Sequence, residues 1–247
     1  MDGLPLEAAI HPSATQSDQG TVVYAHGITA DLTEFGPAVR LADRLADAGF
    51  TVVRFSFRGH GRSGGTQRGM TVAGEMLDLR AVVEYAQIEL PAPLTIAASS
   101  FGAVSTLLSL PWLGDRLHRL VLWRPVLDLH RTFIEPETPW GKENFSDEQV
   151  ERLSTDGFFV LNGTFEVGSV LFEELRHYDP RSQFLKSSVP ALVVHGDQDS
   201  LISYEIARET AESRESCTFH TVKGADHGFD SAEHEEDAIA ATVAWLT

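Results

Sequence analysis

The sequence predicts an α/β fold with a mostly parallel central sheet that is flanked by helices on both faces. The main observation is that short apolar runs, which resemble strands, alternate along the chain with longer segments of helical spacing. The second observation is the length of 247 residues, which α/β folds with a single sheet commonly reach. We therefore expect residues 1–247 to form one domain.

Six apolar runs are the predicted strands: Thr21 to Ala25, Thr51 to Phe55, Leu94 to Ala98, Leu120 to Trp123, Ala191 to His195 and Thr218 to Val222. Between them, segments 38–48 and 72–88 have the spacing of helices with one apolar face. In the second segment that face carries Met76, Leu79, Val82, Val83 and Ala86. We interpret this stripe as core rather than as a cofactor contact.

The segment from residue 128 to residue 187 breaks the alternation. It contains a Pro-rich stretch at 135–140, an acidic helix-like stretch at 146–153 and two aromatic runs on either side of Asn162-Gly163. That dipeptide favours a two-residue hairpin turn. Because long insertions usually serve as lids or binding loops, we predict an inserted cap over residues 128–187 that roofs the functional site.

Aromatic side chains are frequent in the predicted cap. Phe133, Trp140 and Phe165 are the candidate substrate-binding residues, because they could line a pocket for an apolar or aromatic acyl group. The alternative is that the aromatic residues form the cap's own small core. The sequence leaves both interpretations open.

Ser100 is the candidate nucleophile. It lies in Ala98-Ser99-Ser100-Phe101-Gly102, between a strand-like run and a helix-like run. Small residues two positions before and after a serine let the chain turn tightly and expose the hydroxyl, and Ala98 and Gly102 occupy those positions. Ser99 is the weaker candidate, because shifting the motif by one residue puts Phe101 where a small side chain is needed.

A serine nucleophile needs a general base and a third group that orients the base. His227 is the candidate base, in a glycine-flanked turn after the last predicted strand. Asp199 is the candidate acid, in the loop that follows the predicted strand ending at His195. Asp197 lies in the same loop and competes for this role.

The order serine, acid, histidine is associated with the α/β-hydrolase fold. In that fold two backbone N–H groups bind the oxyanion, one from the loop after an early strand and one from the residue after the nucleophile. We assign them to Ile28, in His26-Gly27-Ile28-Thr29, and to Phe101.

On these motifs the chain resembles the α/β-hydrolase superfamily over nearly its whole length. Residues 26–30, 54–63 and 70–75 together resemble the bacterial cinnamoyl and feruloyl esterases and their serine-aminopeptidase-like relatives. The family's His-Gly-x-x-Asp spacing implies Asp199 as the acid. At the elbow the family has Gly-His-Ser-x-Gly-Gly, so here Ser99 replaces a histidine and Phe101 places a ring beside the nucleophile.

Three other histidines lie near the expected site. We interpret His26 and His60 as structural hydrogen-bonding residues and His195 as a strand-end residue. No two histidines have the spacing of metal ligands, so we predict neither a metal nor a cofactor.

Composition limits the partners and the compartment. A formal net charge of −17, spread along the chain, argues against binding to nucleic acid through phosphates. The single Cys217 excludes an internal disulfide framework, and neither a signal-peptide pattern nor a membrane-spanning apolar run is present. We expect a cytoplasmic protein with a small ester-type substrate and neither a nucleic-acid nor a membrane partner, and the sequence leaves a homodimer open.

The function expected from the resemblance is hydrolysis of a carboxylic ester, with an aromatic or medium-length acyl group, through an acyl-enzyme. Thioester cleavage, lactone cleavage and cyclising acyl transfer are the alternatives, because the same triad serves all of them. A homologue that binds a ligand without turnover is the alternative from a different class.

Overall fold

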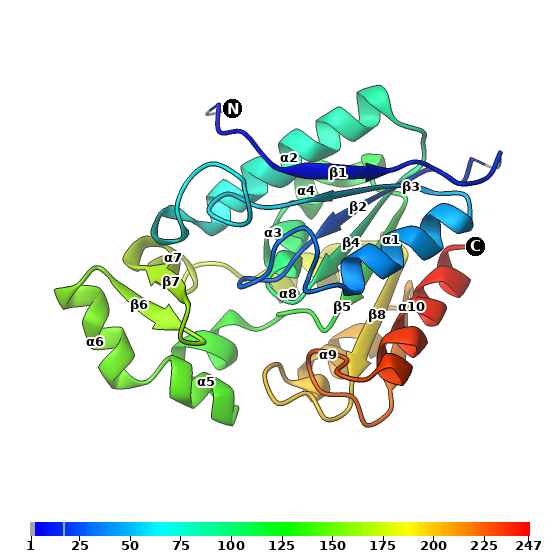
Figure 1. The fold of residues 1–247 in the computed structure, drawn as a ribbon. Coiled ribbons are helices and arrows are strands. Elements are labelled where there is room, and N and C mark those ends of the chain that lie inside the picture. Colours follow the sequence, from blue (N-terminus) through cyan, green and yellow to red (C-terminus); the bar gives the residue numbers. More distant parts are fainter. Residues whose placement is uncertain (1–2, 17) are drawn as a thin grey trace.

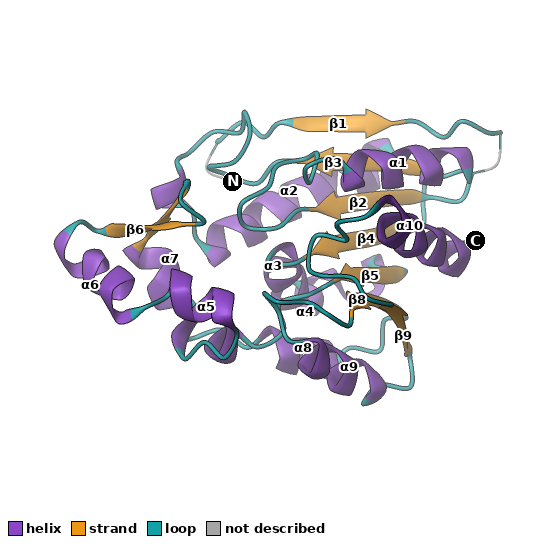
Figure 2. Cartoon of the chain, turned by 60° about the horizontal axis from the view of Figure 1, so that its bottom comes forward, coloured by secondary structure: helices purple, strands orange, loops and turns teal. Residues whose placement is uncertain are grey.

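The central sheet has seven strands in the order β1-β3-β2-β4-β5-β8-β9 (Figures 1 and 2). They are β1 Ala8–His11, β2 Thr21–Ala25, β3 Thr51–Phe55, β4 Leu94–Ser99, β5 Arg119–Trp123, β8 Ala191–Gly196 and β9 Cys217–Val222. All neighbours pair in parallel except β1, which is antiparallel to β3. The computed structural model describes residues 3–16 and 18–247. It confirms the predicted α/β fold.

Each of the six predicted strands is present within one residue of its predicted ends. The edge strand β1 was not predicted, because only Ile10 of its four residues has a large apolar side chain and all four are partly or fully exposed. Its conformation comes from pairing with β3, where Ala8 lies opposite Phe55 and His11 opposite Val52. Short edge strands of this kind depend on their neighbour for their hydrogen bonds.

Helices cover both faces of the sheet (Figure 1). On one face α1 Pro37–Asp47 and α10 Ala232–Leu246 pack on alternate strand residues such as Val22 and Val52. The other face carries α2 Val72–Glu89, α3 Gly102–Leu108, α8 Pro180–Lys186 and α9 Tyr204–Glu212. Short helical turns adjoin this layer at Leu110–Leu113 (α4) and Gly114–Arg116, whereas the turn at Gln67–Gly69 contacts β7 (Phe165–Gly168) and α7 (Ser169–Glu174).

A separate group of elements follows β5: a π-helical turn at His130–Ile134, α5 Pro139–Asn144, α6 Asp147–Thr155, β6 Phe158–Leu161, β7 Phe165–Gly168 and α7 Ser169–Glu174. In Figure 1 this group lies to one side of the sheet, next to the loop that precedes α2. Strands β6 and β7 form the hairpin predicted from Asn162-Gly163, whose φ values are 51° and 72°. These left-handed angles are those that an Asn-Gly turn supplies.

The end of the predicted cap segment packs differently from the rest. Helix α8 lies on α3, and its Phe184 is buried in the main core beneath the sheet. The elements that stand apart from the sheet therefore end before α8. That residues 128–187 form a cap over the functional site remains a prediction.

No helix in the described parts of the chain combines the length and the apolar composition needed to cross a bilayer.

We predict that Gly102→Ala destabilises the fold. The added Cβ would lie 2.4 Å from the carbonyl oxygen of His26 and 2.6 Å from that of Ala25, so α3 must move away from the end of β2. The expected loss in the free energy of unfolding is about 3 kcal/mol, measured by urea denaturation. Gly157→Ala is the control, because nothing lies within 4 Å and only its φ of 78° is unfavourable, at about 1 kcal/mol. Equal losses in the two variants would contradict the steric argument.

Candidate active site

Ser100 lies on the turn between β4 and α3, with a φ of 50°. A left-handed conformation at a residue other than glycine is strained and has to be held by its surroundings. The N–H of Ser100 donates to the carbonyl of Trp123, the last residue of the neighbouring β5, and its own carbonyl accepts from the N–H of Val126 just after that strand. The hydroxyl is thereby turned out of the backbone at the carboxyl edge of the sheet.

The structure places Ser100, His227 and Asp199 in one hydrogen-bonded chain. The Oγ of Ser100 lies 3.1 Å from Nε2 of His227, and Nδ1 of His227 lies 2.8 Å from Oδ2 of Asp199. Because a carboxylate only accepts, Nδ1 carries the proton and Nε2 is free to accept from the serine hydroxyl. Residues more than 120 positions apart in sequence meet here because three loops leave the same edge of the sheet.

The Asp199 carboxylate is fully buried and has four donors. Its Oδ1 accepts from the N–H groups of Leu201 and Ile202, and its Oδ2 accepts from His227 and from Nε2 of His195 at 2.9 Å. Burial alone would raise the pKa of this carboxyl, but the attraction of His227 and the two histidine hydrogen bonds outweigh it. The pKa of Asp199 therefore lies well below its usual range.

The competing acid, Asp197, does not contact His227. Its Oδ1 accepts from the N–H of Gly224 and its Oδ2 lies 3.5 Å from Nζ of Lys223. These contacts tie the loop after β8 to the turn before His227.

The two predicted oxyanion donors belong to Phe101, which follows Ser100, and to Ile28, whose loop packs on the elbow. Within residues 3–16 and 18–247, neither the N–H of Ile28 nor that of Phe101 has a hydrogen-bond partner. The loop carrying Ile28 packs closely on the elbow, since a carbon added at Gly27 would lie 3.2 Å from Cβ and 3.6 Å from Oγ of Ser100. Two free N–H groups beside a serine hydroxyl could receive an oxyanion.

His26 orients the peptide between Gly27 and Ile28. Its Nε2 accepts from the N–H of Phe57, so Nδ1 carries the proton and donates to the carbonyl of Gly27 at 2.8 Å. Since the carbonyl and N–H of a peptide point in opposite directions, this bond sets the direction of the Ile28 N–H. Burial, together with the neighbouring His60, lowers the pKa of His26 to about 3, so the ring is neutral at physiological pH.

His60 connects the loop that carries Ile28 with Phe165 of β7. Its Nε2 lies 2.6 Å from the carbonyl of Ile28, its Nδ1 lies 3.0 Å from that of Arg58, and its ring stacks on Phe165 with centroids 5.0 Å apart. Burial lowers the pKa of His60 despite these carbonyls. Both histidines thus make the structural hydrogen bonds that the sequence suggested.

The candidate substrate-binding residues differ in their surroundings. Phe133 and Phe165 are almost fully buried in an aromatic cluster that continues onto Phe101, whose ring lies 5.8 Å from that of Phe133. Trp140 is half-buried, and its Nε1 donates to Asn162. The aromatic residues therefore form a core for these elements, and Phe133 also reaches a residue beside the nucleophile. Their contact with a substrate remains a prediction.

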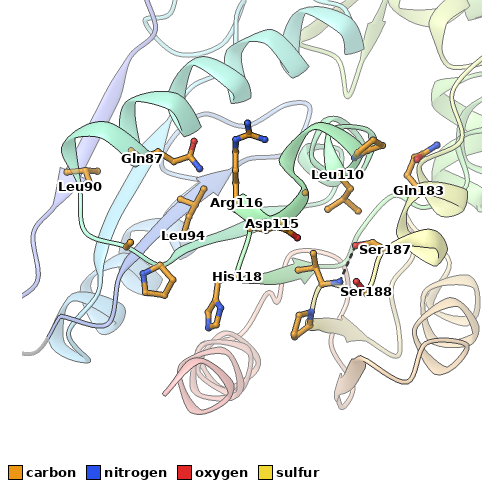
Figure 3. Close-up of a pocket in the computed structure, with 18 of the residues that line it drawn as sticks. Gln87, Leu90, Leu94, Leu110, Asp115, Arg116, His118, Gln183, Ser187 and Ser188 are labelled. Atoms are coloured by element: carbon orange, nitrogen blue, oxygen red, sulfur yellow. Dashed lines mark hydrogen bonds between the residues drawn. The ribbon is translucent and has the colours of Figure 1, made fainter.

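A hollow of about 960 Å³ lies at the opposite edge of the sheet (Figure 3). Its walls include Leu94 and His118, at the amino ends of β4 and β5, and Gln87 from α2. Ser100 follows the carboxyl end of β4, so the length of the strand separates it from this hollow. The hollow is therefore not part of the site around Ser100.

No group of three or more His, Cys, Asp or Glu side chains in the described residues is arranged to hold a metal ion.

The family of the chain follows from its sequence match. Residues 16–155, more than half of the chain, match the family model described as serine aminopeptidase S33. The chain belongs to this family. The resemblance to α/β-hydrolases inferred from the motifs is thereby confirmed, and the match covers the predicted oxyanion loop and the elbow.

Solved structures of other α/β-hydrolases share the fold. Est1E from Butyrivibrio proteoclasticus, with ferulic acid bound, is 21% identical, with a TM-score of 0.82 over 98% of this chain and 96% of that one. A monoacylglycerol lipase from Paleococcus ferrophilus is 19% identical, with a TM-score of 0.71 over 98% of each chain. The enol-lactonase from Burkholderia xenovorans LB400 is 19% identical, with a TM-score of 0.71 over 99% and 97%. No curated protein matches the chain in sequence.

Two features of the site were not predicted from the sequence. His195, interpreted as a strand-end residue, donates to the same oxygen of Asp199 as His227 does. Glu34 and Arg124 form a buried ion pair beneath the elbow, with 3.2 Å between Oε1 and Nη2. No motif marks either residue, because the pair forms between segments 90 positions apart.

We predict that His26 contributes stability that is lost as the pH falls. The unfolded chain binds a proton at His26 near pH 6.5, whereas the native state does so only near pH 3. Between these values the free energy of unfolding decreases on acidification, by up to about 1.4 kcal/mol per pH unit for this proton. His26→Gln should be less stable at pH 7, and its deficit relative to wild type should shrink between pH 6 and pH 4 in urea denaturation.

Carboxylates that become protonated also destabilise the native state in acid. They do so equally in wild type and in His26→Gln, so the difference between the two curves reports on His26 alone. The exposed His118→Gln is the control and should follow the wild-type curve at every pH. A His26→Gln curve that stays parallel to wild type would contradict the assignment of a neutral, buried His26.

Proposed function

We propose that the protein is a serine hydrolase that cleaves a carboxylic ester through an acyl-enzyme intermediate. The observation that supports this most strongly is the distance of 3.1 Å between Oγ of Ser100 and Nε2 of His227. Because Nδ1 of His227 donates its proton to Asp199, Nε2 carries no proton and can accept one from the serine. This is the arrangement that nucleophilic catalysis by a serine requires. The turn at Ser100 adds the exposed hydroxyl.

In acylation, His227 takes the proton of Ser100 as Oγ attacks the ester carbonyl. The carbonyl oxygen becomes an oxyanion and is met by the N–H groups of Ile28 and Phe101. Asp199 stays ionised and stabilises the imidazolium ring of His227. The imidazolium then gives its proton to the departing alcohol, and the acyl group remains on Ser100.

In deacylation, water takes the place of the alcohol. His227 removes a proton from the water as it attacks the acyl carbonyl, and the second tetrahedral intermediate rests on the same two N–H groups. Collapse returns the proton to Ser100 and releases the acid. Side chains and backbone N–H groups of this chain, together with water, carry every step.

The proposed acyl group is aromatic or of medium length. Phe101, next to the nucleophile, lies in the aromatic cluster formed with Phe133 and its neighbours, so the environment on this side of Ser100 is apolar. Aromatic side chains favour stacking with an aromatic acyl group. Bound ferulic acid in Est1E, which has the same fold, is consistent with this choice.

We predict that Ser100→Ala abolishes turnover and leaves the fold intact. The loss of the nucleophile should lower kcat by at least about 10⁴-fold. The substrates are p-nitrophenyl esters of increasing chain length, methyl ferulate, an acyl thioester and a lactone. The exposed Ser188→Ala is the control and should retain full activity.

A fluorophosphonate probe provides a second measurement that is independent of the substrate. It should label wild type and Ser188→Ala but not Ser100→Ala. Preferred turnover of the thioester or the lactone would replace the ester proposal with that activity. If the folded wild-type protein is neither labelled nor active, the protein is a ligand-binding homologue instead.

We predict that His195 helps to position Asp199 against His227. His195→Leu leaves the buried Oδ2 of Asp199 with one donor fewer, so the carboxylate is held less firmly against Nδ1 of His227. We expect kcat/KM to fall by about tenfold. His195→Gln keeps an N–H donor for Asp199 and should retain most of the wild-type kcat/KM. Wild-type kcat/KM in a folded His195→Leu variant would show that this hydrogen bond is structural only.

A further inference from the structure

A single buried carboxylate connects the oxyanion loop with the nucleophile elbow. The side chain of Glu34 is 5% exposed and accepts three hydrogen bonds. Its Oε2 accepts from the N–H of Gly27 at 3.0 Å, and its Oε1 accepts from Oγ of Ser99 at 2.8 Å and from Nη2 of Arg124 at 3.2 Å. The three donors come from the loop after β2, the end of β4 and the end of β5.

The contact with Gly27 completes the anchoring of the oxyanion loop. The carbonyl of Gly27 accepts from Nδ1 of His26 and from the N–H of Ala30, while its N–H is held by Glu34. The peptide that carries the Ile28 N–H is therefore restrained on both sides of Gly27. Without Glu34, the Gly27 N–H would be left without this partner, and the loop could rotate at that peptide.

The contact with Ser99 joins the same carboxylate to the elbow. Ser99 is fully buried and directly precedes the nucleophile. It stands where the esterases that this chain resembles have a histidine. The distance between the elbow and the oxyanion loop is thus set by one carboxylate that both segments bind.

Arg124 balances the charge of Glu34. An unpaired carboxylate beneath the oxyanion site would oppose the negative charge that develops on the substrate. The Arg124 guanidinium is itself buried, pairs with Glu34 and lies over the ring of Phe229, with 4.8 Å between Cζ and the ring centroid. The pair therefore supplies hydrogen bonds without adding net charge near the site.

The segment that presents Glu34 is conformationally strained. Glu34 and Phe35 have φ values of 48° and 59°, and Gly36 follows with 124°. Consecutive left-handed residues persist only where the surroundings hold them, and such strain concentrates at functional sites. Phe35 is 79% exposed, so the contacts that hold this segment are those of the Glu34 carboxylate and the nearby backbone.

We propose that Glu34 is a positioning residue that orients the Ile28 N–H toward the oxyanion by holding Gly27 and Ser99 together, with Arg124 as its counter-ion. This inference rests on the proposed function. Glu34 acts through the backbone of the oxyanion loop and does not touch the reacting atoms.

The test compares four variants. In Glu34→Gln the side chain has one acceptor oxygen where the carboxylate has two. At least one of the three donors, from Gly27, Ser99 and Arg124, therefore loses its hydrogen bond. Glu34→Met combined with Arg124→Met removes both charges together, which avoids leaving an unpaired buried charge. Ser99→Ala removes one donor and leaves the Gly27 contact. Glu236→Gln is the control, because it breaks an exposed ion pair with Arg44 on the molecular surface.

The readouts separate positioning from folding. Active-site titration with a fluorophosphonate gives the concentration of competent serine, to which kcat is normalised. A trifluoromethyl ketone adds to Ser100 and forms an oxyanion there. Its affinity therefore measures how well the N–H groups of Ile28 and Phe101 bind an oxyanion. Thermal unfolding gives the stability of each variant.

We expect the double Met variant to lose about 10²-fold in kcat, with little change in KM and a matching loss of affinity for the ketone. Glu34→Gln should lose about tenfold or more, Ser99→Ala less, and Glu236→Gln nothing. If the Glu34 variants unfold at lower temperature but keep wild-type kcat per titrated site and wild-type ketone affinity, Glu34 is structural and the inference fails. If wild type is not labelled and has no activity, it is the proposed function that fails.

Discussion

The structure around the site depends on one backbone constraint, the left-handed turn at Ser100. Its φ of 50° is accompanied by a close contact of the following helix, which begins at Gly102 against the carbonyls of Ala25 and His26. The same turn is hydrogen-bonded to the end of β5 through the carbonyl of Trp123. The elbow thus fixes β2, β4 and β5 relative to one another. The loops that carry Asp199 and His227 leave the same edge of the sheet after β8 and β9, respectively.

The two buried carboxylates and His26 at this edge have their partners in place, whereas Nε and Nη1 of Arg124 and Nδ1 of His195 have none within the described residues. Asp199 has four donors, Glu34 has three, and His26 is neutral with one donor and one acceptor satisfied. Buried charges and dipoles that are fully bonded cannot reorient, so the groups around Ser100 are arranged before a substrate arrives. The apolar cluster around Phe133 adjoins this polar edge through Phe101, the residue after Ser100.

Local patterns were sufficient to predict most of the sheet and the residues that meet at Ser100. The strands of the interior are continuous apolar runs, and the turn at Ser100 needs small residues at fixed offsets, so both can be recognised in the sequence. Strand β1 has no such pattern, because it forms through its pairing with β3. The packing of α8 on α3 was missed for a similar reason, since the segment before it interrupts the regular alternation.

Residue patterns along the chain were enough to predict the α/β class, the order of serine, acid and histidine, and the hairpin at Asn162-Gly163, because each depends on residues close together in the chain or on their order. The folded chain was needed to see that His195 shares Asp199 with His227, that Glu34 pairs with Arg124 beneath the elbow, and that the aromatic residues near Phe133 pack with one another. These contacts join side chains that point toward each other from different loops. Their geometry is set by the sheet, and no local pattern records it.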